Sequence, residues 1–511
     1  MKNPRRPTMR KTSILHASLA AALLLGWAAP STAATWTALS NSPPDFPGTM
    51  LQLTDGTVIV QNNGSNFAAW MRLTPNSAGS YVNGTWSSLA PMSIQRLYFA
   101  SHVLRNGDVW VLGGEYSGSA LAQNITATGE RYHYSSNTWS AITPHPEGVF
   151  GDDPTMLLDG DKILVGSIFT RNTYLYNTTA NSWSAPISKF YNDRSDEESW
   201  VKLAGGKVLT YDIFQSVATG GGYAELFNPA TNSWASISPS AGTAGGSLPL
   251  LSSSAVGYEQ GASVRLCDGR IFAIGAGAGS PLVAHTALYT PSTNTWAAGP
   301  DIPNHYLADD APATVLPNCH VLLAAEATHF KQPTRLFDYD PGANTITAVA
   351  TPADLTSQFD NVPVYIARLL MLPTGQVLLV NGYNQLWVYT PDGVPDPQLR
   401  PVINQVTYSG GLFHLTGRRI TGQSAGGSYG DDAESDQNYP IIRLQNKTNV
   451  YYVKTSNWSS TAVATGSSLL TTDFCLQPGT PAGNYTMVMS AAGIQSFPVA
   501  ISIPATAATC Q

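Results

Sequence analysis

Charged residues and long apolar runs are both scarce in this 511-residue chain. Charged residues make up 12% of the sequence, and Lys and Arg together number only 26. After the N-terminal segment, no stretch holds the eighteen or so consecutive apolar residues that a membrane-spanning helix needs. A chain that is 43% hydrophobic is neither disordered nor a coiled coil. Helix formers are few, whereas Ser, Thr, Asn, Tyr and Trp abound, and this composition favours an all-β protein.

Cysteine and familiar catalytic motifs are scarce as well. The sequence has no Gly-rich phosphate loop between a strand and a helix, no His-Glu-x-x-His and no Cys-x-x-Cys. The four cysteines all lie in the second half of the chain. An even number in an oxidising compartment predicts two disulfides, and position suggests Cys267 with Cys319 and Cys475 with Cys510.

Residues 1–33 predict an export signal. They carry five cations and then an apolar run from about Leu19 to Ala29, followed by small residues suited to a signal peptidase. The apolar run is too short to cross roughly 30 Å of hydrocarbon, so we expect cleavage and a secreted or periplasmic monomer without a membrane span. Losing five cations takes the net charge from −7 to −12. That charge argues against a nucleic-acid partner, which requires clustered Lys and Arg.

A unit of about fifty residues recurs seven times, the kind of period that repeat architectures show. Each copy has a turn, usually with Gly, followed by a β-rich run: Asp55-Gly56, Asn106-Gly107, Asp159-Gly160, Gly205-Gly206, Asp268-Gly269, Asn318-Cys319 and Thr374-Gly375. In most copies an aromatic residue then precedes Trp at a constant spacing, as Tyr132 precedes Trp139. We expect each copy to form a four-stranded sheet, and seven sheets to close into a β-propeller over residues 34–397.

The seventh copy lacks the segment for its fourth strand. Residues 35–39 resemble the Thr-Trp-Ser strand of the second copy, so we expect the N-terminal segment to complete the seventh sheet. The repeat stops near Pro397. Residues 398–511 show short alternating strands and Gly-rich turns, and they predict an immunoglobulin-like β-sandwich.

The repeat resembles the kelch repeat, and the order of signal, seven repeats and sandwich resembles the galactose oxidase family and its glyoxal oxidase relatives. The resemblance implies a copper ion held by two tyrosines and two histidines, with one tyrosine cross-linked to a cysteine. Arg96-Leu97-Tyr98 matches the family's Arg-x-Tyr stretch, so Tyr98 matches the cross-linked tyrosine. Tyr365 matches the tyrosine of the family's Tyr-His pair.

The other positions of that copper site depart from the family's pattern. The cysteine position before Pro47-Gly48 is Phe46, and Ile366 follows Tyr365 where the family has histidine. The loop that begins Tyr429-Gly430 has no histidine, and Tyr116 replaces a stacking tryptophan. Because copper(II) prefers imidazole nitrogen, a galactose or glyoxal oxidase-like copper oxidase is the least favoured alternative function.

Acidic residues gather instead where the repeats begin. Equivalent positions of a propeller surround one axis, so these carboxylates are expected at one mouth, together with a loop of the C-terminal domain. The candidates are Asp152, Asp153, Asp196, Glu197, Glu198, Glu259, Asp309, Asp310, Asp431, Asp432 and Glu434, with Tyr98, Tyr116 and Tyr365 as aromatic lining.

Three interpretations of this acidic mouth stay open. The favoured one is a binding protein for carbohydrate or another surface polymer, with calcium bound through Asp153, Glu197, Asp310 and Asp432. The second is a glycan-active hydrolase or lyase that uses carboxyls with raised pKa values. The third gives the acidic pairs no function beyond closing turns and protecting sheet edges.

Overall fold

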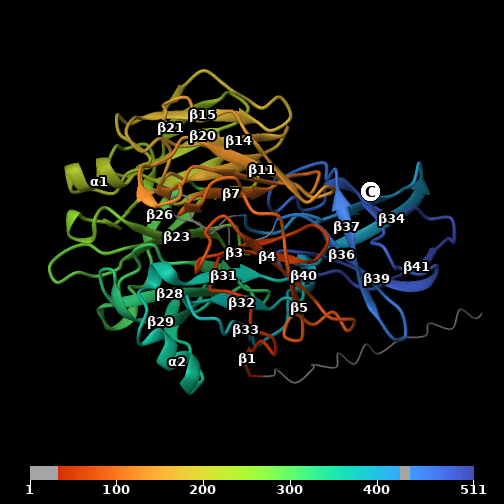
Figure 1. The fold of residues 1–511 in the computed structure, drawn as a ribbon. Helices are drawn as coiled ribbons and strands as arrows, with labels where there is room; N and C mark the ends of the chain where they lie inside the picture. Colours follow the sequence, from red (N-terminus) through yellow and green to blue (C-terminus); the bar gives the residue numbers. More distant parts are fainter. Residues whose placement is uncertain (1–32, 426–437, 511) are drawn as a thin grey trace, which may run out of the picture.

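The computed structural model describes residues 33–425 and 438–510, and that part of the chain is almost entirely β-structure (Figure 1). It contains two short α-helices, α1 (Ile213–Thr219) and α2 (Ala353–Phe359). Four 3-10 turns complete the helical content of the described residues: η1 (Ser254–Val256), η2 (Pro303–His305), η3 (Val364–Ile366) and η4 (Pro397–Leu399). The predicted all-β class is therefore confirmed, and no helix between residues 33 and 425 or 438 and 510 has the length and apolarity to cross a membrane.

Seven sheets, numbered I to VII here, each contain a core of four antiparallel strands within residues 33–425. Sheet I has β2 (Pro47–Gln52), β3 (Val58–Asn62), β4 (Trp70–Thr74) and β5 (Thr85–Ser88). Sheet II has β7 (Ala100–Val103), β8 (Val109–Leu112), β11 (Gly129–His133) and β12 (Thr138–Ala141). Sheet III has β13 (Thr155–Leu158), β14 (Lys162–Val165), β15 (Asn172–Asn177) and β16 (Ser182–Trp183), with β17 (Ile187–Ser188) also on β15.

The remaining sheets follow the same plan. Sheet IV has β18 (Trp200–Lys202), β19 (Val208–Tyr211), β20 (Ala224–Asn228) and β21 (Ser233–Ser236). Sheet V has β23 (Gln260–Arg265), β24 (Ile271–Gly275), β25 (Thr286–Thr290) and β26 (Thr295–Ala298), with β22 (Gly245–Gly246) parallel to β26. Sheet VI has β27 (Ala313–Val315), β28 (Val321–Thr328), β29 (Lys331–Asp340) and β30 (Thr345–Ala348). Sheet VII has β31 (Arg368–Met371), β32 (Val377–Val380), β33 (Trp387–Thr390) and β1 (Thr35–Ala38), and a small sheet contains β6 (Arg96–Leu97), β9 (Tyr116–Ser117) and β10 (Ala122–Gln123).

The first strands of these sheets lie side by side. Strand β13 contacts β18, β18 contacts β23, β23 contacts β27, β27 contacts β31, and β31 contacts β2, which also contacts β7. Almost all residues of these strands are buried, as a strand packed on both faces requires. The ends of the first strands therefore come together in the middle of the molecule, where the loops that precede them can meet.

The N-terminal strand β1 completes sheet VII, as the sequence predicted. It pairs antiparallel with β33, from Thr35 opposite Thr390 to Ala38 opposite Trp387. Trp36 packs its ring 4.7 Å from that of Tyr389. The first and last strands of residues 33–390 are thus hydrogen-bonded in one sheet.

The recurring Asn-x-Trp element has two separate physical roles. Asn137 adopts φ of 51°, a left-handed conformation that asparagine tolerates better than most residues, and its side chain accepts a 3.1 Å hydrogen bond from Tyr132 Oη. Trp139 Nε1 donates to the carbonyl of Ala90, in the segment that leads from sheet I to sheet II. The same Tyr–Asn bond recurs at Tyr176, Tyr289 and Tyr339. The repeat therefore encodes a turn and a link toward the preceding sheet.

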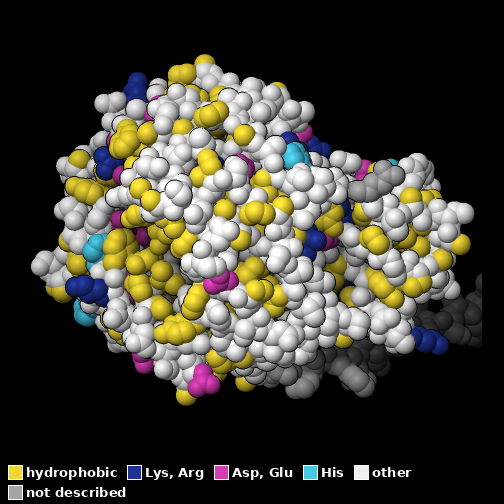
Figure 2. Space-filling model, viewed as in Figure 1, with side chains coloured by type: hydrophobic (Ala, Val, Ile, Leu, Met, Phe, Trp, Pro, Cys, Tyr) yellow, Lys and Arg dark blue, Asp and Glu magenta, His cyan; other side chains and the backbone are white. Residues whose placement is uncertain are grey.

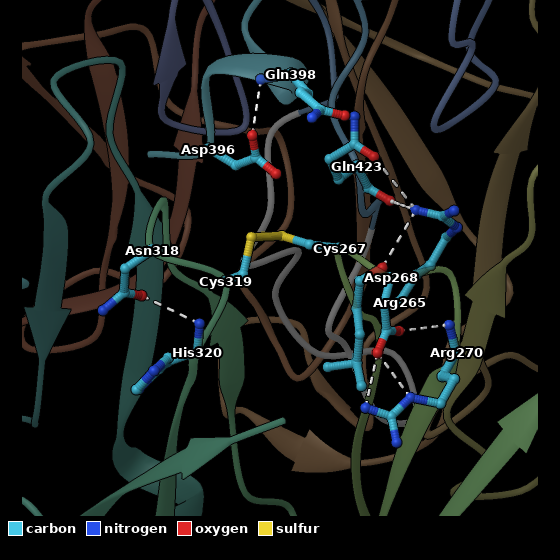
Figure 3. Close-up of a disulfide and its surroundings, with 11 residues drawn as sticks. Arg265, Cys267, Asp268, Arg270, Asn318, Cys319, His320, Asp396, Gln398 and Gln423 are labelled. Carbon is cyan, nitrogen blue, oxygen red and sulfur yellow. Dashed lines mark hydrogen bonds and ion pairs between the residues drawn. A yellow bond between two sulfur atoms is a disulfide. The ribbon is translucent and has the colours of Figure 1, made fainter. Parts of the chain in front are cut away.

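Both predicted disulfides are present. Cys267 and Cys319 join the β23–β24 and β27–β28 turns, which are equivalent turns of sheets V and VI (Figure 3). Cys319 has φ of 73°, so it occupies a left-handed position where glycine stands in most copies. Cys475 and Cys510 form the second bridge within the C-terminal domain.

The C-terminal domain consists of eight strands around its own core. They are β34 (Val402–Ser409), β35 (Leu412–Arg418), β36 (Ile441–Gln445), β37 (Val450–Ser456), β38 (Leu469–Cys475), β39 (Gly483–Ala491), β40 (Ile494–Gln495) and β41 (Val499–Ile503). The domain packs against the hairpin-turn ends of the first strands: Arg105 donates to the carbonyl of Trp458, and Arg265 to that of Gln423. The opposite ends of the first strands, where the preceding loops enter, lie on the face of the molecule away from the C-terminal domain.

Candidate functional site

A repeated backbone conformation marks the loops that precede four of the first strands. Tyr98, Asp152, Glu197 and Asp310 have φ of 53°, 57°, 59° and 51°. Each lies six residues before the buried leucine that starts the following hairpin turn. Non-glycine residues in this region are strained by about 1 to 3 kcal/mol, and such strain gathers at functional sites. Sheets II, III, IV and VI therefore each present a side chain from an equivalent, strained position.

Carboxylates from the loops before four of the sheets meet near these positions. The carboxylate oxygens of Glu197, Glu259 and Asp310 lie within 4.8 Å of one another, and so do those of Asp152, Asp196 and Glu197. We call these five residues the mouth cluster. Glu197 belongs to both groups, so the loops before β13, β18, β23 and β27 converge around it.

The mouth cluster opposes its own ionisation. Burial raises the pKa of Glu197 well above its ordinary value, and the nearby carboxylates of Glu259 and Asp310 raise it further. The pKa of Glu259 is also raised well above its ordinary value, mainly by burial and then by the charge of Asp310. Burial raises the pKa of Asp196 to about 6 even though Arg194 Nε lies 2.8 Å from its carboxylate. A bound cation would relieve both the desolvation and the repulsion.

Two predicted site residues, Asp153 and Glu198, are next to mouth-cluster residues in the chain but are not among the grouped ligand atoms of that cluster. Asp153 is fully buried, and a backbone hydrogen bond from Ile168 only partly offsets the effect of that burial on its pKa. Burial and the charges of Asp196 and Asp152 raise its pKa. Glu198 contacts Lys189. Of the predicted calcium ligands, Glu197 and Asp310 come together with Glu259, whereas Asp153 is not in that group of ligand atoms.

The loop residues Asp431, Asp432 and Glu434 lie outside the described residues. Their predicted place at the mouth stays a prediction.

Lys189 forms the centre of a second acidic cluster, which we call the lysine network. Its Nζ contacts Glu198 and lies 3.4 Å from Asp193, 3.5 Å from Asp212 and 4.0 Å from Glu225. Burial alone would lower the pKa of Lys189, but the surrounding carboxylates raise it well above its ordinary value. The lysine is therefore charged, and it neutralises part of the network.

The tyrosines of the resemblance line one cavity of about 430 Å³. Its walls include Phe46, Tyr98, Tyr365, Ile366 and Arg368. The positions that the resemblance assigns to the family's cysteine, cross-linked tyrosine and Tyr-His pair thus lie together. Phenylalanine and isoleucine supply no ligand atom there, so this donor set does not fit the copper site of that family.

The tyrosine cavity adjoins the mouth cluster. Tyr116 packs its ring 6.1 Å from that of Tyr98, and its pKa is raised by burial, by Glu115 and also by Asp152. Burial, Glu326 and Asp310 likewise raise the pKa of Tyr365. Aromatic faces and carboxylates therefore border a common region.

A third cluster contains residues that sequence reasoning missed. Asp309, which the sequence placed at the mouth, instead joins Glu326 and His329, with ligand atoms within 4.8 Å of one another. Burial and the Asp309 carboxylate raise the pKa of Glu326 to about 9. A signal was present: Glu326 is the one charged residue in the otherwise apolar run of β28.

Comparisons with known proteins support the fold but not an activity. No protein-family model matches the sequence, and no curated protein matches it. Among solved structures, the chain is similar to a fungal alcohol oxidase of the AA5 family, described as having catalytic diversity and solved in complex with copper. The TM-score is 0.50 at 13% identity, over 92% of this chain and 100% of the oxidase. The likeness supports a fold of the galactose oxidase type.

Proposed function

We propose that the protein is an exported binding protein whose mouth cluster holds a divalent cation of the calcium type and, with the nearby tyrosines, binds carbohydrate or another hydroxyl-rich surface polymer. One observation carries this proposal: carboxylates of Glu197, Glu259 and Asp310, from the loops before three different sheets, lie within 4.8 Å of one another while burial and mutual repulsion raise the pKa values of both glutamates.

The chemistry of the mouth suits both partners. Calcium takes six to eight oxygen ligands, often mixing carboxylates with ligand hydroxyls and water. Carboxylates also accept hydrogen bonds from sugar hydroxyls, and aromatic rings cover apolar sugar faces. Tyr98 and Tyr365, which line the adjoining cavity, supply such rings.

The finer architecture belongs to the same proposal. We take sheets I to VII as the blades of a kelch-type propeller over residues 34–397, residues 398–511 as an immunoglobulin-like sandwich, and residues 1–33 as a cleaved signal. The two disulfides support export to an oxidising compartment. On the face shown in Figure 2, Lys and Arg side chains are scattered, which is unlike the basic patch of a nucleic-acid-binding surface.

A second candidate function uses the same residues as a glycan-active hydrolase or lyase. The specific observation in its favour is the pKa of about 6 for Asp196, which burial produces. A carboxyl that titrates near neutral pH suits general acid catalysis, and a partner carboxylate lies close by in Asp152 or Glu197.

The test is calorimetric titration of the full protein with Ca²⁺, followed by a glycan array with and without the ion. We expect saturable binding that Glu197→Gln abolishes. The control Asp354→Asn, which removes one exposed charge from α2, should leave binding unchanged. Retention of a glycan without turnover supports binding, whereas released sugar products favour the enzyme. Peroxide release with stoichiometric copper would overturn both.

A further inference from the structure

The β28–β29 turn of sheet VI brings an imidazole beside two buried carboxyls. Glu326 lies near the end of β28, and His329 follows in the turn before β29. Asp309 comes from the loop before β27, which is held against β28 by paired backbone hydrogen bonds between Leu307 and Glu326. His329 Nδ1 lies 2.5 Å from Asp309 Oδ2.

Each carboxyl of this cluster has one oxygen that accepts a hydrogen bond from the backbone. Glu326 Oε2 accepts a 2.8 Å hydrogen bond from the backbone N–H of Val364, and Asp309 Oδ2 accepts one of 3.2 Å from that of Phe330. No N–H or O–H of the described residues donates to the buried Glu326 Oε1 and Asp309 Oδ1, and the two carboxyls lie at hydrogen-bonding range of each other, which adds to the effect of burial in raising the pKa of Glu326. Both residues are 0% exposed. Metal-binding carboxylates are typically held in this way, with outer hydrogen bonds that orient the ligand oxygen.

We propose that Asp309, Glu326 and His329 bind a divalent transition-metal ion, with Zn²⁺ as the first candidate. Two carboxylate oxygens and one imidazole nitrogen are three of the ligands that zinc takes in proteins, and sites with three protein ligands leave a position for water or a ligand. The imidazole separates this site from the mouth cluster, whose oxygen-only donors suit calcium. The inference is independent of the proposed function.

Other histidines of the chain show why His329 is distinctive. His285 pairs with Asp301 and His414 with Asp473, each at 2.7 Å, but those aspartate side chains are 52% and 22% exposed. A surface pair of this kind is a weak ion pair and leaves no buried oxygen without a donor. His329 is the member of its cluster that reaches solvent, with 30% of its side chain exposed, while the Asp309 side chain is 0% exposed.

The proposed metal site borders the tyrosine cavity. Phe330, next to His329, packs its ring 5.3 Å from that of Tyr365, which lines the cavity. A ligand in the cavity would therefore lie close to Phe330, the neighbour of His329 in the chain.

The experiment is titration of chelator-treated full-length protein with Zn²⁺ alone, followed by calorimetry and by elemental analysis after gel filtration. We expect one ion per chain. His329→Gln should weaken Zn²⁺ binding by about 100-fold. Replacing a residue that only hydrogen-bonds to a metal ligand already costs up to about that much, and His329 is proposed as a ligand itself. The control His285→Gln should bind as the wild type does.

Two further measurements keep the outcome clear. Co²⁺ should give the visible absorption of a low-coordinate cobalt site in the wild type and in Glu197→Gln, but not in Glu326→Gln. Thermal melting in chelator checks that each variant is folded. If Zn²⁺ binding is absent, or is equal in His329→Gln and His285→Gln, the site is an Asp–His ion pair with a protonated Glu326 and the proposal fails. Calcium binding lost only in Glu197→Gln would leave the mouth proposal standing.

Discussion

Two neighbouring residues, Glu197 and Glu198, belong to acidic clusters of opposite character. Glu197 enters the mouth cluster, where the four strongest charges acting on its pKa are all carboxylates. Glu198 enters the lysine network, where Lys189 contacts it and Trp200 Nε1 donates a 3.1 Å hydrogen bond to its carboxylate. The lysine network surrounds a buried cation, whereas the mouth cluster has only Arg194, beside Asp196 at one side, and no cation among Glu197, Glu259 and Asp310.

The difference distinguishes structural carboxylates from candidate ligands. A buried carboxylate that has a cation and hydrogen-bond donors beside it is compensated within the chain for its loss of hydration. Burial raises carboxyl pKa values in both clusters, but carboxyls that crowd together without a central cation lower the stability of the folded state unless protons or an external cation neutralise them. Substitutions within each cluster can test whether the two differ in this way.

Replacing Lys189 should have the largest effect. Lys189→Met leaves Glu198, Asp212 and Glu225 buried without their cation, and breaking a buried ion pair from one side costs about 3 to 5 kcal/mol. Urea unfolding of the variant measures the loss. Lys207→Met, at an exposed position of the β18–β19 turn, should change stability by less than about 0.5 kcal/mol. Equal losses in the two variants would contradict a structural role for the network.

Exchanging each neighbouring glutamate for glutamine should change stability in opposite directions. Glu198→Gln weakens charge-assisted hydrogen bonds to Lys189 and should lower the free energy of unfolding by about 2 kcal/mol. Glu197→Gln removes repulsion from Glu259 and Asp310 and should raise it by about 1 kcal/mol in chelator, as losses of function at strained sites often do. Chemical denaturation of both variants under one set of conditions decides the signs. A loss in Glu197→Gln would mean that the mouth carboxyls stabilise the fold.

The sequence predicted the parts of the molecule that repeat. Asn137 and Trp139 recur because one side chain supports a left-handed turn and the other bonds toward the preceding sheet. Cys267 and Cys319 could be paired because they occupy equivalent turns of successive copies. Strand β1 could be assigned to sheet VII because the seventh copy lacked a partner for β33.

The direction of individual loop side chains could not be predicted. Asp309 and Asp310 are adjacent, yet one joins His329 and the other joins the mouth cluster. Left-handed backbone at Asp310 and Glu197 sets those directions, and no residue type in the sequence announces it. Lys189 was missed for a similar reason, since its partners lie in other loops and strands of sheet IV.

The raised pKa values of the mouth cluster also predict a pH dependence of stability. In the mouth cluster the folded chain holds protons that the unfolded chain releases: burial raises the pKa of Asp196 from 3.8 to about 6, and that of Glu197 is raised as well. Stability contributed by these groups is therefore present below pH 4 and is lost as pH rises through 6. Asp193 and Asp212, with pKa values near 7, act in the same direction, whereas His145, with its pKa lowered to about 4 by burial, acts in the opposite one.

The contribution of the mouth can be isolated because Glu197→Gln leaves those other groups in place. Between pH 4.5 and 7, the fall in the free energy of unfolding should be shallower in this variant than in the wild type, by at most about 1.4 kcal/mol per pH unit, the slope that one proton produces. Calcium should flatten the wild-type profile toward that of the variant, because the ion replaces the protons. Parallel profiles with and without calcium would show that the mouth carboxyls are neutralised within the chain, as those around Lys189 are.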